Sequence, residues 1–308
     1  MTLLVNPTPR YSASAAADGS GNVILFGGKT TANTNTPGFC GNSYKWNGSS
    51  WSEITGVLPP YRGDAACFYD GTNVNIIGGA NETVNLSDMW KCNSTTWSQV
   101  SLPAEVIPYA QPTTLRGAGA CYQSSETSGF IFGGATPYNR HYVLDTWSWA
   151  SNVWTLLAPV NNPVAAEWPA FASNSITAVL FGGKNFDGPS SQCLSWNGTN
   201  WVNVATGVAG VNRPSARFGS SLIWDSSLSR FILFGGFTTN GPANDLWSLN
   251  PTGFVWSNIT QTNPPPPRGF QNLVYSSITS SSLLFGGLST NKVYGDTWLL
   301  ASGIWTQQ

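Results

Sequence analysis

The chain has 308 residues, of which 9% are charged, against roughly 25% in ordinary globular proteins, and its formal net charge is −1. Without a basic run, it lacks the positive surface that binding to nucleic acid or to an anionic membrane requires. No apolar run approaches the ~20 residues of a membrane span. We therefore expect neither nucleic-acid binding nor membrane insertion.

The first segment of the chain, residues 1–9, has neither the charged nor the apolar region of a signal peptide. Either the protein is not secreted by this route or a signal was removed. The composition is poor in Lys and Glu and rich in Asn, Ser, Thr, Gly and Trp. Such a composition favours an extracellular protein or a particle surface over the cytoplasm.

From residue 10 onward, the sequence predicts six units of four short strands each. The first strand of a unit is small and apolar, and the second is β-branched and aromatic and ends in two glycines. The glycine pairs recur every 49 to 55 residues, the period of propeller blades. They are Gly27-Gly28, Gly78-Gly79, Gly133-Gly134, Gly182-Gly183, Gly235-Gly236 and Gly286-Gly287.

Two tryptophans in each unit mark the last two strands. We expect the third strand to begin at the first tryptophan of the pair, and the fourth strand to begin at the second. The first tryptophans are Trp46, Trp90, Trp147, Trp196, Trp247 and Trp298. The second tryptophans are Trp51, Trp97, Trp154, Trp201, Trp256 and Trp305.

This combination of glycine pair, polar gap and spaced tryptophans resembles the kelch repeat, over nearly the whole chain from Arg10 to Trp305. The resemblance implies an all-β, six-bladed β-propeller of four-stranded antiparallel blades, with residues 1–308 in a single domain and residues 1–9 closing or covering blade six. Kelch repeats often place an arginine before the first strand. Five units match this position, with Arg10, Arg62, Arg116, Arg217 and Arg268.

The long loops of such a propeller lie on one face. In an up-and-down blade, the loops after the second and fourth strands share one end of the sheet, and these loops are long here, whereas the others are tight turns. Binding residues usually lie on long loops of a rigid scaffold. The glycine pairs and the five arginines are expected at this same face.

The ring of five arginines is the first candidate site. Guanidinium groups around a narrow channel would bind carboxylates or other anions bidentately, and the kelch resemblance implies acidic partners for this position. In the alternative interpretation each arginine is structural. It then pairs with a repeated aspartate or with backbone carbonyls between blades; the aspartates are Asp88, Asp145, Asp245 and Asp296.

Aromatic side chains of the long loops are the second candidate. Tyr138, Tyr142 and Trp168 lie among Asn, Thr and Gly, a mixture that suits stacking on sugars or packing against a protein partner. They could instead form small cores within the loops. Blade four lacks the arginine and has Glu167 beside Trp168, so we expect an asymmetric notch there that holds the ligand.

Catalytic and metal chemistry has few candidate residues. The only histidine, His141, lies in a loop beside Arg140, and five cysteines without C-x-x-C spacing make neither a zinc site nor a complete disulfide framework. We expect no cofactor and no metal. The leading hypothesis is a non-catalytic interaction domain that binds a protein partner on the long-loop face. A glycan-binding surface protein is the alternative, and a sugar-converting enzyme at the channel mouth is third.

Overall fold

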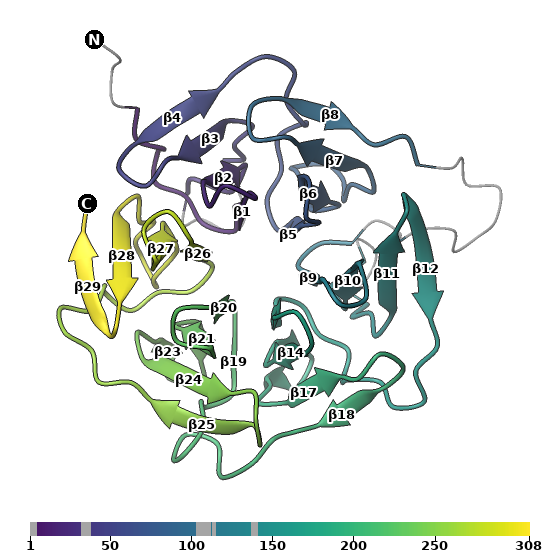
Figure 1. The fold of residues 1–308 in the computed structure, drawn as a ribbon, viewed down its shortest axis with the longest axis vertical. Coiled ribbons are helices and arrows are strands. Elements are labelled where there is room, and N and C mark those ends of the chain that lie inside the picture. Colours follow the sequence, from purple (N-terminus) through teal and green to yellow (C-terminus); the bar gives the residue numbers. More distant parts are fainter. Residues whose placement is uncertain (1–4, 32–37, 103–111, 113–114, 137–140) are drawn as a thin grey trace.

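The computed structural model describes residues 5–31, 38–102, 112, 115–136 and 141–308. These residues form six four-stranded antiparallel sheets, which stand as blades around a central axis (Figure 1). The chain runs once around the circle, so that the first blade lies beside the last. The predicted all-β propeller fold is confirmed, and the described residues include no helix that could span a membrane.

Each blade uses its strands in chain order from the axis outward. The innermost strands are β1 (Ser14–Ala17), β5 (Ala66–Tyr69), β9 (Gly119–Gln123), β13 (Ala170–Ser173), β20 (Ser221–Asp225) and β26 (Asn272–Ser276). The second strands are β2 (Val23–Phe26), β6 (Val74–Ile77), β10 (Ser128–Phe132), β14 (Ala178–Phe181), β21 (Arg230–Phe234) and β27 (Ser281–Phe285).

The outer half of each blade follows the same order. The third strands are β3 (Ser43–Trp46), β7 (Met89–Cys92), β11 (Thr146–Ala150), β17 (Cys193–Trp196), β24 (Leu246–Asn250) and β28 (Thr297–Ala301). The outermost strands are β4 (Trp51–Ile54), β8 (Trp97–Gln99), β12 (Val153–Leu157), β18 (Trp201–Asn203), β25 (Val255–Asn258) and β29 (Ile304–Gln307). Short additional strands extend blades four and five: β15 (Lys184–Asn185), β16 (Gly188–Pro189), β19 (Arg217–Phe218), β22 (Phe237–Thr238) and β23 (Gly241–Pro242).

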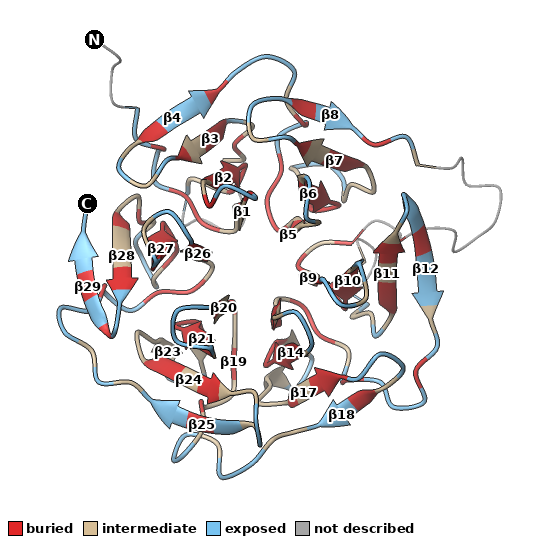
Figure 2. Cartoon of the chain, in the orientation of Figure 1, coloured by how far each residue is buried: buried red, intermediate tan, exposed pale blue. Residues whose placement is uncertain are grey.

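The core lies between neighbouring blades. The second strands are almost entirely buried because each faces another blade on both sides, whereas the outermost strands are mostly exposed apart from their tryptophan and a few other residues (Figure 2). The tryptophan of an outer strand packs on the preceding blade. Trp305, for example, lies 4.9 Å from Phe234 between ring centroids, and Trp201 lies 5.7 Å from Phe132. Large aromatic surfaces buried in this way dominate the packing energy.

The glycine pairs join adjacent blades through their backbone. The N–H of Gly28 donates to the carbonyl of Arg62 in the next blade, at 2.8 Å. Gly27 has a φ of 71°, and a Cβ there would lie 2.4 Å from the same carbonyl oxygen. Only glycine allows this approach without strain, which explains why the pair recurs in every blade.

The predicted start of the third strand is wrong in blades one and four. The first glycine of each pair donates to an equivalent carbonyl in every blade, which is that of Asp88 in blade two but of Asn42 and Gln192 in blades one and four. Trp46 and Trp196 stand four residues after this acceptor, whereas the first tryptophans of the other blades stand two residues after it. They therefore end β3 and β17 instead of beginning them. Each packs across a tight hairpin against the tryptophan of the outer strand, at 5.4 Å.

Blades one and six close the circle without exchanging a strand among the described residues. The N–H of Arg10 donates to the carbonyl of Tyr294, and the N–H of Gly287 donates to the carbonyl of Arg10, both at 2.9 Å. Trp51 adds an indole hydrogen bond to Thr297 at 3.0 Å. Residues 1–4 of the predicted closing segment lie outside the described residues, and residues 5–9 form no strand.

Candidate functional site

The repeated arginine occupies the same place in four blades, not five. The second glycine of each pair donates to the carbonyl of one residue of the next blade, and these acceptors define the equivalent positions: Arg10, Arg62, Leu115, Ala166, Arg217 and Arg268. Arg116 therefore lies one residue beyond the arginine position of blade three. This shift places its side chain in a different environment from those of the other four.

The four aligned arginines are buried, with at most 1% of their surface exposed. In blade five, Arg217 holds both carboxylate oxygens of Asp245 at 2.5 and 2.7 Å and donates to the Gly235 carbonyl at 3.0 Å. Arg62 and Arg268 bind Asp88 and Asp296 in the same way. These guanidinium groups have their donors occupied within the blade, as the structural interpretation requires.

The arginines lower the pKa of the aspartates with which they pair. Burial alone would raise the pKa of Asp245, but the hydrogen bonds and charge of Arg217 outweigh it and hold that pKa below its usual value. The same balance lowers the pKa of Asp88 and Asp296. Arg10 has no aspartate; it donates to the Gly27 carbonyl at 2.9 Å and lies over the ring of Tyr44.

A collar of six residues surrounds the axis just beyond the arginine position. Each residue donates its N–H to the carbonyl of the equivalent residue in the preceding blade, so that six hydrogen bonds of 2.7 to 3.0 Å form a closed ring. All six have φ between 52° and 66°. The collar residues are Ser12, Asp64, Gly117, Trp168, Gly219 and Phe270.

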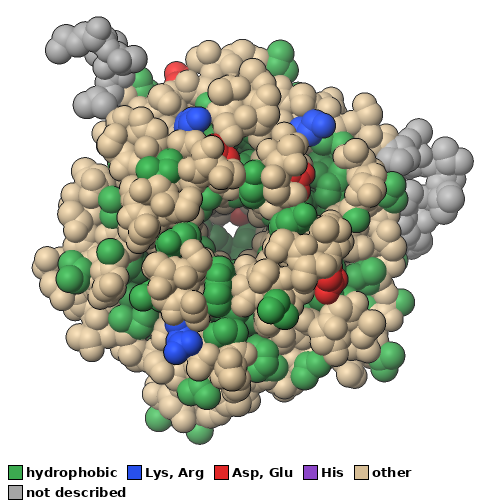
Figure 3. Space-filling view, viewed as in Figure 1, with side chains coloured by type: hydrophobic (Ala, Val, Ile, Leu, Met, Phe, Trp, Pro, Cys, Tyr) green, Lys and Arg blue, Asp and Glu red, His purple; other side chains and the backbone are tan. Residues whose placement is uncertain are grey.

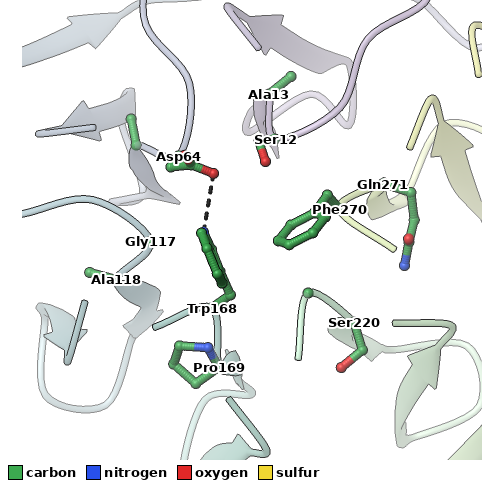
Figure 4. Close-up of a pocket in the computed structure, with 12 residues that line it drawn as sticks. Ser12, Ala13, Asp64, Gly117, Ala118, Trp168, Pro169, Ser220, Phe270 and Gln271 are labelled. Carbon is green, nitrogen blue, oxygen red and sulfur yellow. Dashed lines mark hydrogen bonds between the residues drawn. The ribbon is translucent and has the colours of Figure 1, made fainter. Parts of the chain in front are cut away.

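Four collar residues carry side chains in a conformation that normally favours glycine. For bulky residues such as Trp168 and Phe270, positive φ is a genuine outlier, and such strain concentrates at functional sites. Their rings meet edge to face at 5.2 Å. Figure 4 shows Trp168, Phe270, Asp64 and Ser12 converging on the channel from four blades.

The collar forms the floor of a cavity of about 410 Å³ at the mouth of the channel, and a narrow opening on the axis is visible in Figure 3. The cavity belongs to the long-loop face, because Lys29, Lys184, Phe237 and Leu288 each follow a glycine pair directly. Its walls are cationic and aromatic. They comprise Tyr11, Ser12, Lys29, Asp64, Arg116, Trp168, Lys184, Phe218, Phe237, Phe270 and Leu288.

Two buried acids anchor this wall. Asp64 forms an ion pair with Lys29 and accepts the indole N–H of Trp168 at 3.1 Å. Burial would raise the pKa of Asp64, but Lys29 outweighs it and lowers that pKa. Glu167, 1% exposed, accepts a hydrogen bond at 3.0 Å from Nε of Arg116.

Two cations of the mouth keep donors available. The terminal nitrogens of Arg116 make no hydrogen bond to any described residue, and about a quarter of its side chain is exposed. The Lys184 ammonium has no hydrogen-bond or ion-pair partner in the described part of the chain; it lies 5.1 Å from the centre of the Phe218 ring. An anion that enters the cavity therefore meets two cations beside a wall of aromatic rings.

The structure thus brings three of the predicted residues together, namely Arg116, Glu167 and Trp168. Tyr142 lies at the rim, where it packs edge to face on Phe186 at 4.7 Å, and Tyr138 lies outside the described residues. His141 is exposed, and all five cysteines are free. Among the described residues, no group of three His, Cys, Asp or Glu side chains is placed to hold a metal ion.

The sequence interpretation missed Lys29, Asp64, Lys184, Phe218 and Phe270, which line the mouth. Two positional rules would have found most of them. The residue after a glycine pair faces the mouth in four blades, and the residue two places beyond the aligned arginine position enters the collar.

Comparison with known proteins agrees with this architecture. Residues 170–308, which form blades four to six, match the family model described as the KLHDC2/KLHL20/DRC7 Kelch-repeats domain. No curated protein sequence gave a match to the chain. Blades one to three repeat the strand order, the glycine pairs and the interblade hydrogen bonds of the matched half. The chain is therefore a β-propeller that is similar to the kelch-repeat family, with the match lying in residues 170–308.

Proposed function

We propose that this propeller binds a protein partner on its long-loop face, and that the partner inserts an acidic side chain into the channel mouth beside Trp168. Kelch-repeat propellers are generally protein-interaction domains. The observation that carries the finer proposal is a pair of cations, Arg116 and Lys184, in a cavity that also has an aromatic wall. Both have donors that no described residue occupies.

The chemistry of the mouth favours a carboxylate next to an apolar group. Arg116 offers two parallel N–H donors, the geometry that matches a carboxylate. Lys184 adds a second charge, and Trp168, Phe218 and Phe270 offer apolar surface for the neighbouring side chain. A cavity of about 410 Å³ has the size of ordinary ligand pockets. It holds one or two side chains of a partner and leaves the surrounding loops to contact its surface.

Selection from a displayed random-peptide library supplies a defined probe. Selected peptides should be enriched in Asp or Glu adjacent to an aromatic or aliphatic residue. The double variant Arg116→Ala, Lys184→Ala should weaken binding of the best peptide at least ten-fold, a loss of about 1.4 kcal/mol or more. Lys45→Ala with Lys91→Ala removes the same charge from third strands and is the matched control. Equal losses in both double variants would exclude the mouth as the site.

A glycan is the second candidate ligand. Phe186 is 76% exposed and is supported from the side by Tyr142, an arrangement that suits stacking on a sugar ring. A glycan array separates the two proposals. Binding to a defined glycan that is lost in Phe186→Ala and kept in the Arg116, Lys184 double variant would favour the glycan over the acidic peptide.

A further inference from the structure

Three blades contain the same guanidinium-binding group within the chain. In blades two, five and six, an aspartate carboxylate and the carbonyl of the first glycine of the pair together hold one arginine. In blade six, Arg268 donates to Asp296 at 2.6 and 2.9 Å and to the Gly286 carbonyl at 2.9 Å. Two oxygens in one plane and a third beside them match the fork of a guanidinium.

Blade three has the same acceptors without the arginine. The N–H of Gly133 donates to the carbonyl of Asp145 at 3.2 Å, as in the three other blades, so the backbone of these two residues is aligned alike. Leu115 stands at the arginine position, and its side chain has no hydrogen-bond donor. The arginine of this blade, Arg116, is the next residue and lies at the channel mouth instead. Within the described ranges, neither the Asp145 carboxylate nor the Gly133 carbonyl accepts a hydrogen bond.

The two remaining blades satisfy their glycine carbonyl by other means. In blade four, Gln192 donates to the Gly182 carbonyl at 3.1 Å, and in blade one Arg10 donates to the Gly27 carbonyl at 2.9 Å. Among the described residues, blade three is the one blade in which the carbonyl of the first glycine accepts no side-chain hydrogen bond. Burial raises the pKa of Asp145, with no partner to offset it.

We propose that Asp145 and the carbonyl of Gly133 form a binding site for a guanidinium group, which an arginine side chain of a protein partner supplies. Asp145 is half-buried and its neighbour Leu144 is 46% exposed, so the site can be reached from the rim. Arginine fits better than lysine, because two carboxylate oxygens and a carbonyl require a planar group with several donors. This site is separate from the cations of the channel mouth.

Titration with arginine amide, followed through the ¹³C resonance of the Asp145 carboxyl carbon at constant ionic strength, tests this site directly. We expect a saturable shift. Lysine amide at the same concentrations should bind several-fold more weakly. A shift that follows salt concentration alone, or equal binding of the two amides, would overturn the proposal.

Leu115→Arg is the decisive variant, because it restores the arginine that three other blades have. It should fill the site from within the chain and weaken the binding of arginine amide at least ten-fold, whereas Leu115→Met, which lengthens the side chain without adding a charge, should not. Unchanged binding in Leu115→Arg would refute the assignment. The variant Arg140→Ala is measured in parallel. If a saturable shift arises only in this variant, the chain's own arginine is the occupant, and a partner's arginine is excluded.

Discussion

Displacement of one arginine by one residue separates blade three from its neighbours. Arg62, Arg217 and Arg268 are fixed between an aspartate and a glycine carbonyl, whereas Arg116 reaches Glu167 and the channel mouth. Within the part of the chain that the structure describes, the shift leaves the terminal nitrogens of Arg116 free at the channel mouth and the Asp145 carboxylate without a partner. Blade three thereby breaks the near-sixfold symmetry of the propeller, so that a partner can bind in one orientation only.

The two kinds of aspartate should respond in opposite ways to neutralisation. Asp245→Asn leaves the 1% exposed Arg217 without its counter-charge, and we expect a loss near the lower end of the ~3–5 kcal/mol seen for broken buried pairs, since Asp245 itself is partly exposed. Asp145→Asn removes a charge that has no partner among the described residues. Its free energy of unfolding at pH 7, measured by urea denaturation, should be unchanged or slightly higher. Equal losses in the two variants would contradict this distinction.

The same acids predict the response to pH. Asp88, Asp245 and Asp296 have a pKa lower in the folded than in the unfolded state, so their contribution is present above the unfolded value of about 4 and is lost as the pH falls through the folded pKa. Asp145 has a raised folded pKa and acts with the opposite sign. Urea denaturation from pH 7 to pH 2 should show a steep loss below pH 4. The advantage of Asp145→Asn over the natural chain should grow as the pH rises from about 4.

Among the structural elements, the collar is the least regular and the closest to the candidate site. Six successive inter-blade hydrogen bonds fix residues with positive φ, and each residue other than glycine costs about 1–2 kcal/mol in this conformation. The blade sheets hold them there. The strained residues are the ones whose side chains line the mouth, which is consistent with a rigid, preformed site.

Substitution of a collar glycine measures how tightly this element is packed. A Cβ on Gly219 would lie 2.8 Å from the ring of Phe270, whereas on Gly253, in an outer hairpin, the nearest atom is 4.0 Å away. Both glycines have positive φ. Gly253→Ala should cost only the backbone term of about 1 kcal/mol, and Gly219→Ala should cost about 1–3 kcal/mol more through the clash. If chemical denaturation shows similar losses in the free energy of unfolding for the two variants, the ring of Phe270 moves aside at little cost and the collar is not tightly packed.

On the scale of the whole molecule, the sequence predicted the architecture well and the binding residues incompletely. The glycine pairs and paired tryptophans identify six blades because each has a fixed structural duty, as Gly27 and Trp305 illustrate. The tryptophans of blades one and four were misplaced, since a W-N-G-x-x-W hairpin places Trp46 and Trp196 two residues further along the strand than the first tryptophans of the other blades. Spacing alone does not distinguish these positions.

The candidate site was predicted only in part because it depends on single-residue register. In the sequence around Leu115 and Arg116, either residue could occupy the arginine position, and only the interblade hydrogen bonds decide between them. Asp64, Trp168 and Phe270 face the axis because their backbone is left-handed, and nothing in the local sequence requires that conformation. Glu167 and Trp168 were singled out because they break the repeat.

The central claim is that the displaced arginine makes the channel mouth a site for an acidic segment. The measurement that tests it most directly is the Kd of the selected acidic peptide for the double variant Leu115→Arg, Arg116→Gly, which restores the sequence pattern of blade two. Circular dichroism and the Tm first establish that the variant is folded. The affinity should fall at least ten-fold in the double variant and remain within about two-fold in Leu115→Arg alone, which keeps Arg116. An unchanged affinity in the folded double variant would contradict the account.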